Sequence, residues 1–146
     1  MRNVVLILVI ASALFSCGEN NSKKNGVSSM QIPKDSSLFT KITWLDSTNR
    51  DFGAIPEGQK LEVTYRFLNS GANPLIIARV QPSCGCTVAE QPDEPILPGK
   101  EGVIKASFNS EGRAGINHKK LYVIANTQGT QSNEVQFSVL VQKKKW

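Results

Sequence analysis

Histidine and cysteine are scarce in this chain, which argues against several kinds of chemistry. The 146 residues include one His and three Cys. A structural zinc site needs four converging ligands, and a catalytic triad needs a nucleophile, a base and an orienting carboxylate. No such set of side chains can be recognised in the sequence, and its length suits one ordinary domain with processing segments. We therefore expect no enzymatic activity, no metal site and no cofactor.

The body of the chain also lacks an excess of charge of either sign. The formal net charge is +5, yet the span from Lys41 to Leu140 contains ten basic and ten acidic residues. The basic surplus lies near the two ends, where the sequence ends in the tail 143–146, Lys-Lys-Lys-Trp. A nucleic-acid-binding domain carries its basic stripe on the folded face, because phosphate contacts dominate its affinity. We expect no nucleic-acid partner.

The longest apolar run is too short to cross a membrane. It covers the 12 residues from Val4 to Phe15, whereas a transmembrane helix needs about 20. Because it follows Arg2 and ends in small residues, it is typical of a signal peptide; the alternative is a buried strand or helical hairpin. The ending Leu14–Cys17 resembles the lipobox of bacterial lipoproteins. We predict a lipoprotein signal peptide over 1–16 and lipidation of Cys17.

The residues after Cys17 are predominantly polar. The segment 18–37 is rich in Asn, Ser and Lys and too poor in apolar residues to bury a core, so we predict a flexible tether over 17–38. With an acyl anchor, the protein would sit in the cell envelope as a membrane-anchored lipoprotein. We expect it at the outer membrane, facing the periplasm, an oxidising compartment that permits disulfides.

From Phe39 onward the apolar residues recur with a period of two, which is typical of strands that bury one face. In 60–67, Leu61, Val63, Tyr65 and Phe67 share one face. The segment 121–125 is apolar on both faces, which predicts a central strand. Altogether the pattern predicts strands at 42–45, 60–67, after Pro74, around 104–108, at 121–125 and at 135–139.

Turn residues separate these strands, and Pro98-Gly99 fits the centre of a type II turn. At least six strands in about 104 residues approach the size of an immunoglobulin domain, which has about seven strands in about 100 residues. We therefore predict an all-β, immunoglobulin-like antiparallel sandwich of about seven strands over 39–142.

The order and spacing of several short motifs resemble those of a known family. The motifs are Phe52-Gly53-Ala54-Ile55, Asn69-Ser70-Gly71, Pro74-Leu75-Ile76-Ile77, Ser83-Cys84-Gly85-Cys86-Thr87, Pro98-Gly99, and Gly115 followed by Lys119, Leu121, Val123 and Asn126. From about Trp44 to about Val141 the chain resembles the bacterial envelope family called domain of unknown function 1573. The resemblance implies an immunoglobulin-like fold, loosely similar to Hydin and major sperm protein domains, often on lipid-anchored or secreted chains. It implies no activity.

Cys84 and Cys86 are the side chains with the clearest potential for reactivity. Residues i and i+2 of a strand face the same side, and Gly85 allows the backbone to tighten into a turn that brings the sulfurs together. A structural disulfide is the leading interpretation, and a redox-labile pair, soft-metal binding to two thiolates and buried free thiols are the alternatives. His118 would complete a metal site, but beside two lysines we expect it in a solvated turn.

Two functions from different classes remain open. The first is a lipid-anchored, noncatalytic binding or scaffolding module that presents a sheet edge or loops to an envelope protein that the sequence does not identify. The second is a periplasmic thiol-redox or soft-metal-handling protein that acts through Cys84 and Cys86. We favour the first.

Acylation of Cys17 is testable by intact-mass analysis of the protein from membrane fractions. Because the signal peptide would be removed, we expect a chain that begins at Cys17 and carries added acyl mass. A Cys17→Ser variant should lose that mass and leave the membrane fraction. An unmodified wild-type chain that retains Met1 would contradict the prediction.

Overall fold

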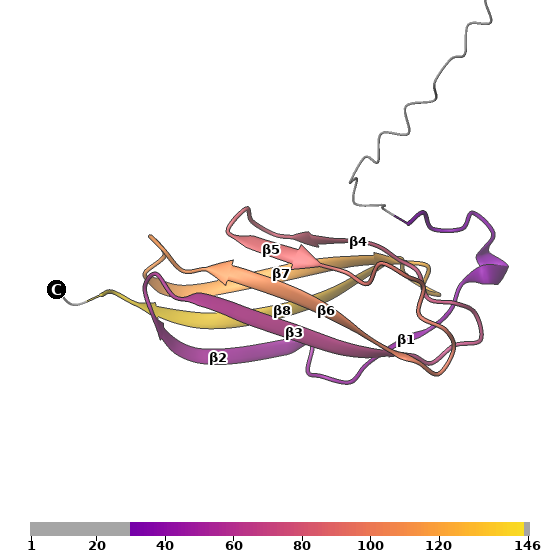
Figure 1. Cartoon of the computed structure of the whole chain (residues 1–146), viewed down its shortest axis with the longest axis horizontal. Helices are drawn as coiled ribbons and strands as arrows, with labels where there is room; N and C mark the ends of the chain where they lie inside the picture. Colours follow the sequence, from indigo (N-terminus) through magenta and orange to yellow (C-terminus); the bar gives the residue numbers. More distant parts are fainter. Residues whose placement is uncertain (1–29, 145–146) are drawn as a thin grey trace, which may run out of the picture.

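A computed structural model describes residues 30–144, and its regular structure is almost entirely β (Figure 1). A short 3-10 turn precedes the strands, and no helix in these residues is long and apolar enough to cross a membrane. The elements are η1 (Ser36–Leu38), β1 (Ile42–Trp44), β2 (Asn49–Pro56), β3 (Lys60–Asn69), β4 (Ile77–Pro82), β5 (Thr87–Glu90), β6 (Glu101–Asn109), β7 (Gly115–Ala125) and β8 (Ser132–Gln142).

The strands form two sheets of four that pack face to face. The first sheet has the order β1-β3-β6-β5 and the second the order β2-β8-β7-β4. In Figure 1, η1 lies at one end of the sandwich and β8 finishes at the other. We call these the N-terminal end and the C-terminal end. The predicted all-β, immunoglobulin-like sandwich is confirmed, and the expected lipidation site Cys17 lies outside the described residues.

One strand pair differs from the predicted antiparallel arrangement. β2 pairs with β8 in parallel, from Asn49 opposite Gln136 to Pro56 opposite Gln142. The reason is that the chain does not reverse between β1 and β2: it bends over a few residues and continues in the same direction in the other sheet. Both β2 and the short strand β5 were absent from the predicted strands, so the sandwich has eight strands.

The core lies between the inner faces of the sheets. The predicted face of β3 is confirmed: Val63, Tyr65 and Phe67 are fully buried, and Leu61 is half-buried. Phe108 of β6 and Phe137 of β8 meet edge to face with ring centroids 6.1 Å apart, which joins the two sheets. Each such side chain contributes about 1.5–3 kcal/mol when fully buried. The remaining buried apolar residues are Ile55, Leu75, Ile77, Cys86, Ile104, Ala106, Leu121, Val123, Ala125, Val135, Val139 and Val141.

β7 occupies the central position that its sequence predicts. It pairs with β8 along ten positions and with β4 on its other side. Leu121 and Val123 face the core, whereas Tyr122 and Ile124 lie half-exposed on the outer face of the second sheet. The strand also begins earlier than expected, at Gly115, so His118 lies in a strand rather than in a solvated turn.

Two asparagine side-chain amides close the N-terminal end. Asn126 donates from Nδ2 to the carbonyls of Leu38 and Pro74, both at 3.0 Å, and accepts the Ile76 N–H at 2.7 Å. Asn73 donates to the carbonyls of Ser37 and Phe39. These bonds hold the chain from Ser37 onward, so ordered contacts begin before the domain start at residue 39 that the sequence suggests.

Two glycines meet specific geometric demands. Gly99 has φ +73°, and the Lys100 N–H donates to the Leu97 carbonyl at 3.0 Å, as the predicted type II turn requires. At Gly102 an added Cβ would lie 2.4 Å from the Phe67 ring. A side chain at Gly102 would therefore displace the ring from the centre of the core.

Truncation of Phe67 tests the assignment of the buried face. Phe67→Ala should lower the free energy of unfolding by about 3–5 kcal/mol, because it removes a fully buried ring. Thr64→Ala, on the exposed face of the same strand, is the matched control and should change it by less than about 0.5 kcal/mol. Urea denaturation followed by circular dichroism measures both. Equal effects would mean that the register of β3 is wrong.

Candidate functional site

The two cysteines of the body lie in the turn between β4 and β5. The sulfurs of Cys84 and Cys86 are 2.02 Å apart, a disulfide distance, and their Cα atoms are separated by 5.3 Å. The Thr87 N–H donates to the Cys84 carbonyl at 3.3 Å, which closes the turn. Cys86 is buried against the core and Cys84 is half-buried. The pair thus closes the β4–β5 turn near the C-terminal end.

The other potential metal ligand lies two residues from Lys120, which exchanges hydrogen bonds with Ser83 at the start of this turn. His118 lies on the outer face of β7, opposite Ser138, and Ser138 lies opposite Asp51. No group of three or more His, Cys, Asp or Glu side chains in the described part of the chain is placed to hold a metal ion. The structure therefore does not bring His118 together with Cys84 and Cys86 in such a group.

Asp51, Ser138 and His118 lie in a row across β2, β8 and β7. They are the residue types of a hydrolase triad, but their order across the strands differs from that of a triad. Serine occupies the middle strand, so the strands that carry Asp51 and His118 are about 9–10 Å apart. A triad needs the imidazole between the hydroxyl and the carboxylate. The Asp51 carboxylate instead accepts the Gly53 N–H at 3.0 Å. This arrangement supports no nucleophilic catalysis.

The same row borders a shallow apolar hollow on the outer face of the second sheet. The register aligns Ala54, Leu140 and Ile116 across three strands beside a cavity of about 450 Å³. Ile116 is 73% exposed, the highest value among the exposed large apolar side chains. The hollow lies toward the C-terminal end, where β7 begins and β8 finishes.

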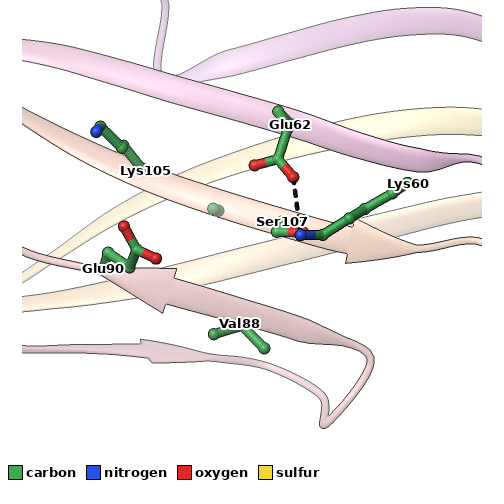
Figure 2. A pocket seen from close by; sticks show the side chains of 7 residues that line it. Lys60, Glu62, Val88, Glu90, Lys105 and Ser107 are labelled. Atoms are coloured by element: carbon green, nitrogen blue, oxygen red, sulfur yellow. Dashed lines mark ion pairs between the residues drawn. The ribbon is translucent and has the colours of Figure 1, made fainter.

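The outer face of the first sheet is charged instead. Figure 2 shows Lys60, Glu62, Glu90 and Lys105 around a hollow of about 200 Å³ that spans β3, β6 and β5. Lys60 and Glu62 form an exposed ion pair at 3.2 Å. Exposed pairs of this kind contribute about 0–1 kcal/mol. Alternating charges of this kind are typical of a sheet face that is exposed to solvent.

Side chains from neighbouring segments cover part of the free edge of β4. The side-chain amide of Gln91 accepts the Val80 N–H at 2.9 Å and donates to the Ala78 carbonyl at 3.1 Å. Uncovered backbone groups at a sheet edge would be free to pair with another chain. Gln91 satisfies the Val80 N–H and the Ala78 carbonyl within the domain.

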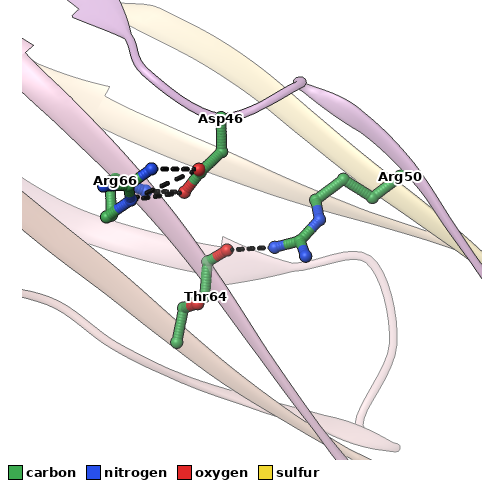
Figure 3. A network of polar contacts seen from close by, with 4 residues as sticks. All are labelled: Asp46, Arg50, Thr64 and Arg66. Atoms are coloured by element: carbon green, nitrogen blue, oxygen red, sulfur yellow. Dashed lines mark hydrogen bonds and ion pairs between the residues drawn. The ribbon is translucent and has the colours of Figure 1, made fainter.

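The free edge of β3 is covered in part by the segment that connects the sheets. The Asp46 carboxylate accepts the Arg66 N–H at 2.7 Å, and Arg50 reaches from β2 to the Thr64 carbonyl at 2.7 Å (Figure 3). Hydrogen bonds from the Arg66 side chain lower the pKa of Asp46, and the same contact raises the pKa of Arg66. The contact therefore favours the charged form of both groups.

A segment of β6 also lacks a neighbouring strand on one side. β5 covers only the second half of β6, from Lys105 to Phe108, and then the chain turns away at Gln91 and Pro92. A groove of about 400 Å³ lies next to the uncovered segment Glu101–Val103. Its walls include Glu90, Pro92, Asp93 and Ile96. This groove is the candidate binding site.

Comparison with known families places the chain. The profile of the family described as Protein of unknown function (DUF1573) matches residues 43–141. The chain belongs to this family. The match covers β1 to β8 apart from the last residue of β8 and the first of β1, so it coincides with the sandwich of this chain. The resemblance noted from the motifs is confirmed. No curated protein matches the sequence significantly.

Solved structures share the fold at low sequence identity. A protein of unknown function from Porphyromonas gingivalis W83 is 17% identical with a TM-score of 0.62, over 73% of this chain and 49% of that one. The secreted serine protease VesC from Vibrio cholerae is 15% identical with a TM-score of 0.52, over 73% and 24%. The ASH / PapD-like domain 7 of human CEP192 is 13% identical with a TM-score of 0.51, over 83% and 97%.

These comparisons support the fold and not a function. The chain spans about half the length of the P. gingivalis protein and about a quarter of VesC. At identities of this size, the likeness carries no activity to the DUF1573 chain.

The groove beside β6, Gln91 and Asp46 were not identified from the sequence. Gln91 precedes the sequence Pro-Asp-Glu-Pro, which is typical of a turn, but this pattern gives no sign of the contact of Gln91 with β4.

The contribution of the Cys84–Cys86 bond is testable by reduction. Closing a loop of three residues contributes about 1.6 kcal/mol in the chain-entropy estimate, so reduction should lower the free energy of unfolding by less than about 2 kcal/mol and leave the sandwich folded. Denaturation with and without reductant measures this. Thiol titration in denaturant, before reduction, should find almost no reactive thiol when Cys17 is acylated. Two reactive thiols would contradict pairing, and copper recovered with them would favour a metal site.

Proposed function

We propose that this DUF1573 chain is a lipid-anchored envelope protein whose noncatalytic sandwich binds another envelope protein through a sheet edge. The anchor would be Cys17, and residues 17–38 would serve as a spacer whose last residues are held by the N-terminal end of the sandwich. The location that follows is the outer membrane, with the domain in the periplasm. The partner is identified here only by its class, a protein of the same compartment.

The observation that supports binding is the unpaired segment of β6 that lies beside a groove. Gln91 covers part of the edge of β4, and Asp46 with Arg50 covers part of the edge of β3. The edge of β6 at Glu101–Val103 faces a groove instead. Natural sheets usually protect their edges against pairing with other chains. An edge left open beside a preformed groove is a feature that a binding protein uses.

The spacer suits this role because it confines the domain near its partner. A flexible polar chain of about 20 residues has a root-mean-square end-to-end distance of about 25 Å. Confinement within such a distance of the membrane raises the effective concentration of the domain toward other envelope proteins. A binding module of modest affinity would then suffice.

Partner capture in living cells tests the proposal. The full chain with a C-terminal tag is crosslinked in intact cells and purified with its bound proteins, next to a control in which residues 1–38 carry an unrelated domain. We expect proteins that are enriched with the full chain and not with the control. The Cys84→Ser, Cys86→Ser double variant should capture the same proteins.

Two outcomes contradict the proposal. If the control captures the same proteins, then the sandwich is not the binding part. If the double cysteine variant is folded by circular dichroism and loses its partners, the thiol-based alternative is favoured.

A further inference from the structure

The alternation of backbone groups along β6 shows which of its residues face the open edge. The Asn69 N–H on β3 donates to the Lys100 carbonyl at 3.0 Å. Backbone groups alternate in direction along a strand, so the N–H and C=O groups of the even-numbered residues of β6 point toward β3. Independently, the Asn109 N–H donates to the Cys86 carbonyl at 3.0 Å, so the odd-numbered residues face β5. Both observations direct the N–H and C=O groups of Glu101 and Val103 away from β3.

β5 does not extend far enough to pair with these groups. Its last paired residue is Glu90, opposite Lys105. Two residues further along, the position that would oppose Val103 is Pro92, which has no N–H to donate. The chain leaves the sheet there. Within the described chain, no hydrogen bond reaches the backbone of Glu101 or Val103 from this side.

The groove beside this segment has room for an extended peptide. Its volume is about 400 Å³, and the Val103 side chain is 38% exposed at its rim. Half-buried Ile96 and Pro92 form the apolar part of its wall. A strand added here would lie in line with β5 and would meet backbone donors and acceptors on β6 and an apolar contact beside them.

The charges around the groove select the kind of peptide. Glu90, Asp93 and Glu101 line it, and Lys105 is the single basic side chain among the lining residues. The nearby guanidinium of Arg66 is already bound by Asp46 at 3.0 Å. The groove therefore has an excess of negative charge, which favours cationic side chains on the partner.

We propose that the β6 edge at Glu101–Val103 binds an extended, basic segment of a partner protein by β-strand addition. The backbone of that segment pairs with Glu101 and Val103, and its Lys or Arg side chains face Glu90, Asp93 and Glu101. This inference rests on the proposed function and specifies both the surface and the chemistry of the partner.

A synthetic peptide provides the probe for the test. Acetyl-Val-Lys-Val-Lys-Val-Lys-amide alternates in the way a strand requires, and acetyl-Val-Glu-Val-Glu-Val-Glu-amide is its matched acidic control. Fluorescence anisotropy of labelled peptide with the full chain, purified from membranes, measures affinity. Residue-resolved hydrogen exchange locates the contact. We expect the basic peptide to bind at least tenfold more tightly than the acidic one and to slow exchange at Glu101 and Val103 at least tenfold.

Two proline variants test whether the peptide binds at the β6 edge. Val103→Pro removes an N–H that faces the groove and leaves the ladder to β3 intact, because proline is tolerated where the N–H faces outward. Thr64→Pro removes an outward N–H from the edge of β3 and is the matched control. Val103→Pro should weaken peptide binding at least tenfold, and Thr64→Pro should change it less than twofold. Circular dichroism verifies that both variants are folded.

Absence of peptide binding at millimolar concentration, equal binding of both peptides, or unchanged binding by a folded Val103→Pro variant would overturn this inference. If Val103→Pro does not fold, a Glu101→Lys variant replaces it and should weaken binding of the basic peptide at least fivefold. The proposed function is judged separately by capture in cells. Capture that persists in the Val103→Pro variant would uphold the binding role and refute this surface.

Discussion

The burial of each sheet's inner face against the other is the constraint on which the rest of the structure depends. Neither sheet can hide its apolar side alone, and the rings of Phe108 and Phe137 meet across the interface. The Tyr65 hydroxyl crosses the same gap to the Gln136 carbonyl at 2.7 Å, and burial raises its pKa to about 12. With both inner faces occupied, only outer faces, edges and loops remain for binding.

Several residues of the motifs on which the family resemblance was based stabilise the sandwich through hydrogen bonds and close packing. The Asn69 amide donates to two carbonyls and accepts from the Gly71 N–H and the Thr40 hydroxyl. Gly71 lies so close to Thr40 that no side chain fits there. The Asn126 amide also donates to two carbonyls, and it accepts from the Ile76 N–H. Asn69 and Asn126 thus satisfy partly buried backbone groups, where an unpaired polar group costs about 1–3 kcal/mol.

The parts of the fold that could be predicted from the sequence are those set by local periodicity. Alternation in 60–67 identified the buried face of β3, and the doubly apolar 121–125 identified a central strand. β2 was missed because Gly53 and Pro56 interrupt its pattern. The parallel pairing of β2 with β8 depends on a change of sheet that no local pattern encodes. The groove beside β6 could not be predicted for the same reason, because it exists only where β5 ends before β6 does.

The hydrogen bonds that Asn73 and Asn126 make to residues 37–39 have a mechanical meaning. Together with the Thr40 N–H bond to the Asn126 carbonyl, they attach the incoming chain at several points before the first strand begins. A tensile load applied to residues before Ser36 reaches these bonds before it reaches the pairing of β1 with β3. The bonds at the N-terminal end therefore stand between such a load and the first strand.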